Sequence, residues 1–451
     1  MTHSTPFPRS RKLLALFVLG ALIALYVQLT YIPMSSHPFG LFHMQLDLDI
    51  YREAASKWGH GHSVYDGPVI GTMQYTYAPF SVLALQPLGW LTHWIAVYVW
   101  SAAIFATLWW VVVASFRSLG YRYDWRMGVS ALCLVVICCL MEPVRTTIWY
   151  GQINVFLMAI VLWDLLRPDG SRLRGIGVGI TAGIKLTPAF FIFYLAVIKQ
   201  WKAVIITACT FTTTVVAGFL IMPRQSWNYW TSQVFDSSRV APSERIPSNQ
   251  SVKGMLTHVL NTDSPSTLVW LPCALVAAAL GLGAAWLAHQ RGQELLALTI
   301  TGMTMCAVSP FSWGHHWVWF VPLMVYVVHL CIQSGRRVIT DVQWGRPARW
   351  WWPVLAVVGV VALYLSVFAW RIHFAGPVNI GSELWPHGWY ETGWFMLLTP
   401  DWIHWFAMQP YLWVFVVTSV SAIVAWGPAA VRARRAPASS ASSAGSVPAH
   451  R

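Results

Sequence analysis

The sequence has 451 residues, of which 57% are hydrophobic and 10% are charged, and it carries a formal net charge of +13. Soluble globular proteins are about half apolar and about a quarter charged, so this composition argues against a soluble protein and indicates a polytopic membrane protein. The basic residues lie between apolar segments along the chain, and this placement argues against a nucleic-acid-binding protein.

Apolar segments of about 18–25 residues, the length needed to cross a bilayer, recur along the whole chain. The predicted spans are residues 13–31, 93–116, 127–141, 152–166, 201–222, 266–288, 293–309, 315–333, 351–371 and 403–427. Residues 79–91 are expected to form a short interfacial helix. The stretch 175–197 is interrupted at Lys185-Leu-Thr-Pro188, which predicts two half-length helices that dip into the membrane and return.

These elements predict an all-α polytopic membrane protein with a single integral membrane domain over residues 1–435. The polar, low-complexity residues 436–451 are expected to form a disordered cytoplasmic tail. No small-residue cleavage site follows the first apolar segment, so it is expected to be an anchor and not a cleaved signal peptide.

The basic residues predict the orientation of the spans. Arg9, Arg11 and Lys12 place the N-terminus in the cytoplasm, and most of the other Lys and Arg then lie on the cytoplasmic side if 175–197 returns to the side where it enters. Most of the Asp and Glu lie on the outer side. If 175–197 instead crosses fully, every segment after it is inverted.

The cysteines predict neither disulfides nor a metal site, because they are odd in number, lack metal-ligand spacing and lie in or at the ends of apolar segments. They are interpreted as small packing residues. Their positions are 133, 138, 139, 209, 273, 306 and 331.

Unusual polar and aromatic residues collect in the segments expected outside, which are 32–92, 142–151, 223–265, 309–315 and 372–402. They are Tyr75 and Tyr77 in "MQYTYAPFSVL", Glu142, Arg145, Gln152 and Asn154 in "EPVRTTIWYGQINVFLM", and Trp313, His315 and His316 in "VSPFSWGHHWVWF". Each group also has a structural explanation, because aromatic belts line membrane interfaces and amides cap helices or join neighbouring helices.

Lys185 is a stronger candidate for function. It lies inside an apolar stretch, where a charge costs several kcal/mol unless it is paired or reached by water. An ammonium at a broken helix suits a phosphate ligand. The structural alternative is that Lys185 snorkels, or pairs with Glu142 or Asp164.

Two acids in "HMQLDLDIYREAASKWGHG" stand out in so apolar a chain. If residues 47–58 are helical, Asp49 has a local salt-bridge partner in Arg52, whereas Asp47 shares a face with Tyr51 and has no basic partner. An unpaired acid beside a membrane cavity is a candidate general base. We therefore expect a structural salt bridge for Asp49 and a catalytic role for Asp47.

A base, cationic phosphate binders and many aromatic residues on one face suit sugar transfer from a lipid-phosphate donor. The base would deprotonate an acceptor hydroxyl, which would attack the anomeric carbon and invert it. The negative charge of the leaving lipid phosphate would be stabilised by Lys, Arg and His donors. No general acid is then required.

Six motifs occur in order and together resemble glycosyltransferase family 87, the polyprenyl-phosphate-mannose-dependent α-1,2-mannosyltransferases of mycobacteria and relatives within the GT-C superfamily. The motifs are "DLDIYREA" (47–54), "YTYAPFSVLALQPL" (75–88), "YGQINVFLMAIVLWDLL" (150–166), "GVGITAGIKLTPAFFIFYL" (177–195), "NQSVKGM" (249–255) and "VSPFSWGHHWVWF" (308–320). The resemblance covers about residues 40–330, and the rest of the chain matches only in being hydrophobic.

The resemblance implies a GT-C fold with about 10–12 transmembrane helices and short outer-face helices, in the plasma membrane, with an active site facing away from the cytoplasm. It implies a polyprenyl-phosphate-mannose donor and a glycolipid mannoside acceptor, either a phosphatidylinositol mannoside or lipomannan and lipoarabinomannan. Membrane lipids are expected partners, nucleic acid is not, and no cofactor or metal is expected.

The resemblance also implies roles for individual residues. Asp47 maps to the presumed base, although spacing alone leaves Asp49 open, and His315 and His316 are implied near the donor phosphate or the acceptor. Residues expected to contact substrate are Asp49, Tyr51, Arg52, Tyr75, Tyr77, Glu142, Arg145, Gln152, Asn154, Lys185, Asn249 and Trp313.

Two alternatives stay open at this point. The family includes an arabinofuranosyltransferase branch, against which the His-His-Trp turn argues by its pattern alone. A transporter or flippase for a lipid-linked sugar would also have many spans and a broken helix. However, the sequence shows no inverted repeat, and its polar residues gather at one face.

Overall fold

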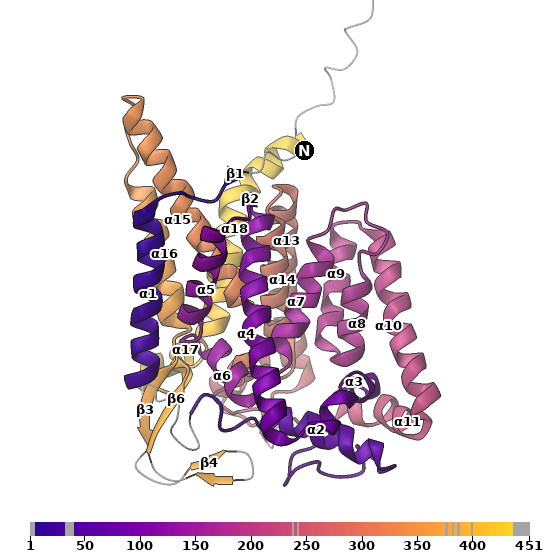
Figure 1. The fold of residues 1–451 in the computed structure, drawn as a ribbon. Coiled ribbons are helices and arrows are strands. Elements are labelled where there is room, and N and C mark those ends of the chain that lie inside the picture. The colour runs from indigo at the N-terminus through magenta and orange to yellow at the C-terminus, as the bar shows by residue number, and fades with distance from the viewer. Residues whose placement is uncertain are drawn as a thin grey trace, which may run out of the picture.

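The computed structural model describes residues 5–31, 40–236, 239–240, 243–374, 378–380, 383–385, 388–397 and 400–435. Within these residues the chain is a helical bundle, closed at one end by a layer of short helices that includes α2 (Leu46–Gly59), α3 (Pro79–Ala84) and α11 (Pro223–Thr231) (Figure 1). We call this end the site face. The predicted tail, 436–451, lies outside the described residues.

Each predicted span contains a helix. In the described part of the chain, five helices are long and apolar enough to cross a membrane: α1 (Arg11–Thr30), α4 (His93–Ser118), α10 (Trp201–Ile221), α13 (Thr267–Gln290) and α18 (Pro410–Arg435). Other helices of the bundle include α5 (Trp125–Cys138), α6 (Glu142–Tyr150), α7 (Asn154–Leu165), α14 (Glu294–Val308), α15 (Phe320–Gln343) and α16 (Trp351–Ser366). The bent pair α6 and α7, which meet at 116°, would make a sixth span.

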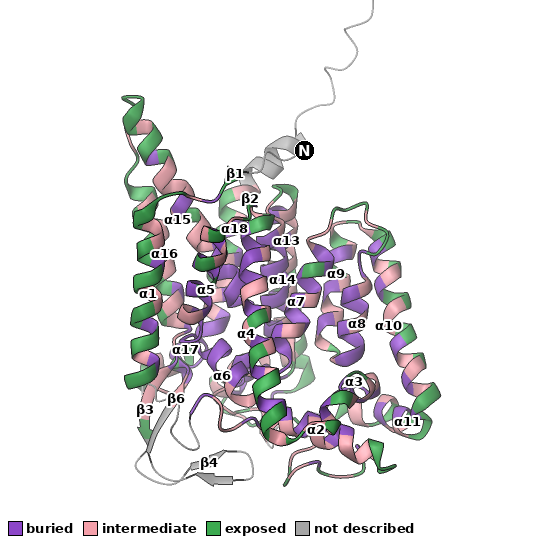
Figure 2. Cartoon of the chain, in the orientation of Figure 1, coloured by how far each residue is buried: buried purple, intermediate pink, exposed green. Residues whose placement is uncertain are grey.

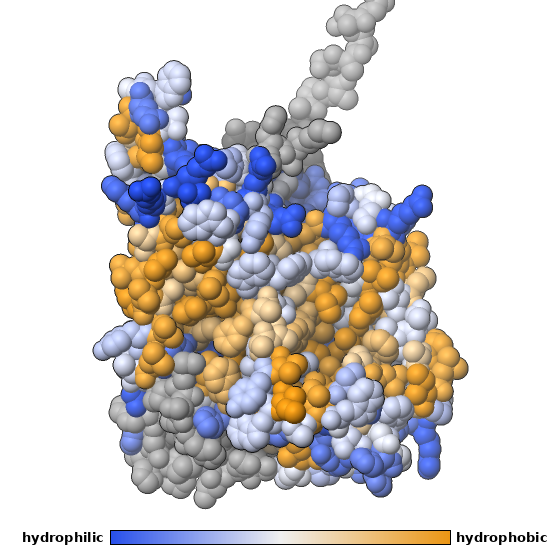
Figure 3. All heavy atoms as spheres, in the orientation of Figure 1, coloured by the Kyte–Doolittle hydropathy of each residue, from blue (hydrophilic) through white to orange (hydrophobic). Residues whose placement is uncertain are grey.

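Large apolar side chains on the outside of the bundle show that it is built for a lipid environment. Leu220 in α10 is 78% exposed and Leu268 in α13 is 87% exposed. Exposed residues cover the outer helices, and apolar residues dominate the middle of the surface between two more hydrophilic ends (Figures 2 and 3). Soluble monomers rarely expose contiguous apolar surface of this kind. The chain is therefore a multi-pass membrane protein.

The predicted break at Lys185 is confirmed. Helix α8 (Ile176–Ile184) ends at Lys185, and a 3-10 turn (η2, Thr187–Phe190) carries Pro188 into α9 (Phe191–Val197). Pro188 cannot continue α8, because it lacks an N–H and its ring disfavours helical backbone before it. The two ends of this broken segment lie on the same face of the bundle, opposite the site face (Figure 1).

The boundaries of two predicted spans differ from the structure. The span expected over 351–371 ends at Ser366, and Trp370–Phe374 form a strand in which apolar residues alternate with Arg371 and His373. The span expected over 403–427 is divided into α17 (Asp401–Ala407) and α18, because Pro410 begins a new helix.

Small strand pairs lie outside the bundle helices. Strand β3 (Trp370–Phe374) pairs antiparallel with β6 (Gly388–Thr392), and β4 (Val378–Ile380) pairs antiparallel with β5 (Glu383–Trp385). A parallel pair joins β1 (Thr5–Pro6) to β2 (Tyr121–Arg122). The remaining short elements are η1 (Gln86–Trp90), η3 (Gln233–Phe235), α12 (Val252–Val259), η5 (Gly314–His316) and η6 (Trp394–Met396).

The site-face layer has its own hydrophobic cluster, separate from the core of the bundle. It joins α2 to the segment before α3 through buried residues that include Leu48, Tyr51, Tyr65, Tyr75 and Tyr77. Ile153 and Leu157, at the start of α7, belong to the same cluster. The layer is thus packed onto the bundle at the α6–α7 turn.

Helix α2 packs tightly against the bundle at Gly151, which ends α6 with φ +68°. A Cβ atom there would lie 2.6 Å from the Cβ of Leu48 and 2.8 Å from Gln45 Oε1. Gln45 anchors the start of α2 at this contact. Its backbone N–H donates to Trp149 O at 2.8 Å and its Nε2 donates to Ile148 O at 2.9 Å. Glycine is required here both by conformation and by space.

We predict that Gly151→Ala lowers the stability of the protein by about 2 kcal/mol or more, because it adds a steric overlap with Leu48 to the cost of positive φ. The matched control is Gly61→Ala at the other end of α2, where φ is +81° and no atom lies within 4 Å of the added Cβ. That variant should lose only about 1 kcal/mol. Thermal unfolding in detergent compares them, and equal losses would contradict the close approach.

Candidate active site

The first turn of α2 presents Asp47 to the interior of the protein. Gln45 fixes the start of this helix on the α6–α7 turn, as described above, and Asp47 follows two residues later. Its side chain is partly buried and receives a hydrogen bond from Gln152. Among the described residues, no Lys, Arg or His forms an ion pair with it.

Burial raises the pKa of Asp47 to about 7. The positive charge of Lys185 and the hydrogen bond from Gln152 act in the opposite direction and keep the pKa from rising further. A carboxylate with this pKa is ionised in part at neutral pH and is a much stronger base than an exposed aspartate.

Asp49 has a different environment. Its Oδ1 accepts a hydrogen bond from Arg52 Nη1 at 2.8 Å and lies 2.9 Å from His93 Nδ1. Arg52 also donates to Leu91 O at 2.8 Å, which ties α2 to the segment before α4. The predicted salt bridge between Asp49 and Arg52 is therefore present, and both side chains are engaged with the protein.

Gln152 connects several of the predicted site residues. Its Oε1 accepts hydrogen bonds from Tyr51 Oη at 2.7 Å, from Tyr77 Oη at 3.1 Å and from the backbone N–H of Ile153 at 2.9 Å. These donors fix the orientation of the amide, so its NH₂ group faces Asp47 and His315.

The orientation of Gln152 determines the state of His315. Gln152 Nε2 is a donor and lies 3.3 Å from His315 Nε2, so this ring nitrogen accepts and the imidazole is neutral. Burial, followed by the nearby charge of Lys185, lowers the pKa of His315 well below its ordinary value. The ring also lies edge-on to Tyr150 and stacks with Trp313.

Lys185 lies at the same site, at the break between α8 and η2. Its Nζ donates to Asn154 Oδ1 at 2.9 Å and to His316 Nε2 at 3.1 Å, and it lies 5.1 Å from the ring centre of Tyr77. Asn154 in turn donates to His315 O at 3.0 Å. Lys185 pairs with neither Glu142 nor Asp164, so that alternative for its side chain is wrong.

Buried residues around the His-His turn hold it in place. Asn249 Oδ1 accepts from Ser312 N at 3.0 Å, and Gln250 N donates to Ser312 O at 2.8 Å. Glu142 accepts hydrogen bonds from Tyr411 and Thr146, and its carboxylate lies directly against Gly314. A side chain at position 314 would overlap with that carboxylate. Asn249 and Glu142 thus support the turn that carries the histidines.

Some predicted site residues lie apart from this group. Arg145 is 4% exposed, and its guanidinium contacts Gln28 Oε1 at 3.1 Å and Glu391 Oε2 at 3.2 Å. It joins α6 to α1 and β6. Tyr75 bonds Ser81 Oγ at 2.6 Å and packs within the aromatic cluster beneath α2.

The predicted residues that the structure brings together are Asp47, Tyr51, Tyr77, Gln152, Asn154, Lys185, His315 and His316. Sequence reasoning missed Gln45, Tyr150 and Tyr411. Tyr150 stands in the "YGQIN" motif and could have been found there, whereas no charge or periodicity singles out Gln45 or Tyr411.

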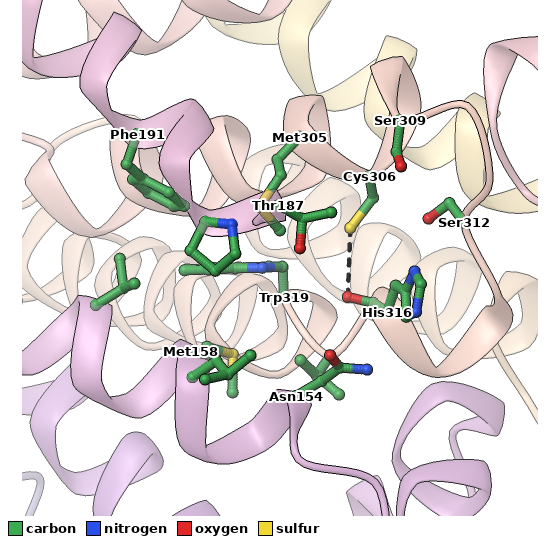
Figure 4. Close-up of a pocket in the computed structure, with 14 residues that line it drawn as sticks. Asn154, Met158, Thr187, Phe191, Met305, Cys306, Ser309, Ser312, His316 and Trp319 are labelled. Carbon is green, nitrogen blue, oxygen red and sulfur yellow. Dashed lines mark hydrogen bonds between the residues drawn. The ribbon is translucent and has the colours of Figure 1, made fainter. Parts of the chain in front are cut away.

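A narrow pocket opens beside His316 and Asn154 (Figure 4). It lies between α7, η2–α9, α14 and the His-His turn. Polar side chains of Asn154, Ser312 and His316 lie toward one side of it, and Met158 and Phe191 lie toward the other (Figure 4). In the described part of the chain, no three His, Cys, Asp or Glu side chains come together to hold a metal ion.

Comparisons with known proteins place these features in a family. Residues 75–310 match glycosyltransferase family 87. No solved structure matches the chain.

Named relatives cover most of the chain. The polyprenol-phosphate-mannose-dependent alpha-(1-2)-phosphatidylinositol pentamannoside mannosyltransferase of Mycolicibacterium smegmatis is 32% identical over 334 residues, which are 70% of this chain and 76% of the relative. The Mycobacterium tuberculosis protein of the same name is 30% identical over 364 residues, 76% of this chain and 80% of the relative.

A second kind of relative matches over a shorter length. The polyprenol-phosphate-mannose-dependent alpha-(1-2)-phosphatidylinositol mannoside mannosyltransferase of M. smegmatis is 29% identical over 309 residues, 62% of this chain and 69% of the relative. Because the family match spans more than half of the sequence and a relative above 30% identity covers more than two thirds of it, the chain belongs to glycosyltransferase family 87.

Proposed function

We propose that this membrane glycosyltransferase transfers mannose from polyprenol-phosphate-mannose to a phosphatidylinositol mannoside, in α-1,2 linkage with inversion, and that Asp47 is the general base. The names of the relatives support the donor, the acceptor class and the linkage. The observation that carries the assignment of the base is the environment of Asp47, which is partly buried, not ion-paired among the described residues, and has a pKa raised to about 7.

The proposed reaction uses this geometry. The Asp47 carboxylate accepts the proton of an acceptor hydroxyl, and the oxygen attacks the anomeric carbon of the donor mannose from the face opposite the phosphate. A C–O glycosidic bond forms while the bond from the anomeric carbon to the phosphate oxygen breaks. The electron pair leaves with the polyprenol phosphate, so the anomeric centre inverts.

Lys185 is placed to stabilise the leaving phosphate. Its ammonium uses two of its three N–H bonds on Asn154 and His316, which leaves one for a phosphate oxygen. A positive charge in a site with little water stabilises developing negative charge more strongly than it would in bulk water. His316 accepts from Lys185 at Nε2 and therefore carries its proton on Nδ1.

The neutral His315 has a positioning role in this proposal. It accepts from Gln152 Nε2, the same group that donates to Asp47, and so helps to orient the carboxylate. The pocket beside His316 and Asn154, with apolar residues such as Met158 and Phe191 on its far side, suits the isoprenoid chain of the donor.

The site is proposed to face away from the cytoplasm. The site face lies opposite the α7–α8 connection (166–175) and the α9–α10 connection (198–200), which are rich in Lys and Arg. Cytoplasmic loops carry an excess of these residues. Replacing the exposed His62 of the site face with Cys should therefore allow labelling by a membrane-impermeant maleimide in intact cells; labelling only after lysis would reverse the orientation.

We predict that Asp47→Asn lowers kcat/KM by about 10²–10⁴-fold, the usual contribution of a general base. The assay uses purified protein, polyprenol-phosphate-mannose with labelled mannose, and a panel of phosphatidylinositol mannosides. Asp49→Asn is the matched control, because it removes the same charge two residues away and should cost less than about tenfold. If Asp49→Asn is inactive and Asp47→Asn is active, the base is misassigned. An arabinofuranosyl donor and a flippase assay, run in parallel, test the alternative activities.

The raised pKa of Asp47 also predicts how stability depends on pH. The carboxyl of Asp47 has a higher pKa in the folded protein than in the unfolded chain, so its ionisation destabilises the fold, and stability decreases as pH rises from about 4 to about 7. Asp47→Asn should therefore melt at a higher temperature than wild type at pH 8, and the two should converge near pH 4. Activity should instead decrease as the pH is lowered below about 7, because Asp47 becomes protonated. Equal melting temperatures at pH 8 would contradict the assignment.

A further inference from the structure

A second pocket lies on the face opposite the site and takes no part in the proposed reaction. It is formed where the α7–α8 connection meets the α9–α10 connection and the first turn of α10. Its polar lining consists of Asp169, Ser171, Arg174, Lys199, Gln200 and Lys202. These two connections are also the two ends of the broken α8–α9 segment that carries Lys185.

The charges that line this pocket do not balance. Arg174 is fully buried and pairs with Asp169 at 3.2 Å and with Glu294 at 3.1 Å, while its Nε has no hydrogen-bond partner. Arg174 is shared between these two carboxylates, so together with Lys199 and Lys202 three cations face Asp169 and Glu294. Within the described residues, the ammonium groups of Lys199 and Lys202 have no hydrogen-bond acceptor or acidic partner. The pocket is left with an excess of positive charge.

The first turn of α10 adds backbone donors to these cations. The N–H groups of Trp201, Lys202 and Ala203 have no partner within the helix, and no side chain caps them. The neighbouring helix α8 is different, because the Asp164 carboxylate accepts from Gly175 N at 3.0 Å and from Val178 N at 3.1 Å. An uncapped helix start together with two lysines and a serine hydroxyl suits a phosphate oxyanion.

The height of the pocket in the membrane indicates the source of that phosphate. Helix α10 is long and apolar enough to span the bilayer, so its first turn lies near the level of the lipid headgroups. Trp201 in that turn is 60% exposed, as expected for an aromatic residue at the membrane interface. Basic pockets between helices at this level bind anionic headgroups.

We propose that this pocket binds the phosphate of an anionic phospholipid headgroup. The lipid bridges the connections at both ends of the α8–α9 segment and thereby stabilises the segment that carries Lys185. The proposal does not depend on the reaction proposed above, and its test does not measure transfer.

The test uses the delipidated full-length protein and phosphatidylglycerol in neutral detergent micelles, with bound lipid measured by native mass spectrometry. The double variant Lys199→Gln, Lys202→Gln should bind phosphatidylglycerol about 30-fold more weakly, because each lysine near the headgroups contributes about fivefold. Its melting temperature without lipid should equal that of wild type, since neither side chain has a protein partner in the described residues. Added phosphatidylglycerol should raise the melting temperature of wild type only.

The matched control is Arg11→Gln, Lys12→Gln, which removes two exposed charges at the start of α1, on the same face and outside the pocket. It should bind the lipid as wild type does. Equal binding by the pocket variant, or an equal loss by the control, would overturn the proposal. Phosphatidylcholine and inorganic phosphate serve as competitors: displacement by millimolar phosphate would retain the oxyanion site and make free phosphate its ligand, whereas resistance to phosphate supports the lipid headgroup.

Discussion

The structure depends on a positive charge held inside an apolar bundle. The ammonium of Lys185 is partly buried among apolar helices, where an unsatisfied charge is costly, and the chain accommodates it by breaking a helix at that residue. Pro188 prevents α8 from continuing. Asn154 and His316 accept hydrogen bonds from the ammonium, and the negative charge of Asp47 stabilises it. Each of these residues comes from a different element, so the packing of α2, α7 and the His-His turn is coupled to one cation.

The same arrangement explains why Asp47 and Asp49 differ although they are only two residues apart. Helical periodicity turns Asp49 toward Arg52 and His93, which hold it as an ordinary ion pair. Asp47 faces the interior, where it has a hydrogen bond from Gln152 and the distant charge of Lys185 but no ion pair within the described residues. Burial without a close cation is what raises its pKa, and the same burial makes it suitable as a base near neutral pH.

Much of this arrangement could be predicted from the sequence. The break at Lys185, the salt bridge of Asp49 and the gathering of polar residues at one face follow from local rules on proline, helical spacing and the cost of buried charge. Gln45 could not be found this way, because its role depends on the carbonyl groups of Ile148 and Trp149, about a hundred residues later. Arg145 was expected to contact substrate because its actual partners, Gln28 and Glu391, are distant in sequence. Such long-range pairs are set by packing, which periodicity does not report.

The raised pKa of Asp47 is a property of its environment in the fold. It is tested most directly by infrared spectroscopy of the purified protein as a function of pH, taking the difference between wild type and Asp47→Asn. A protonated-carboxyl band should appear in wild type as the pH falls through about 7 and should be missing from the variant. If that band appears only near pH 4, the value of an exposed aspartate, the environment of Asp47 does not prepare it to act as a base.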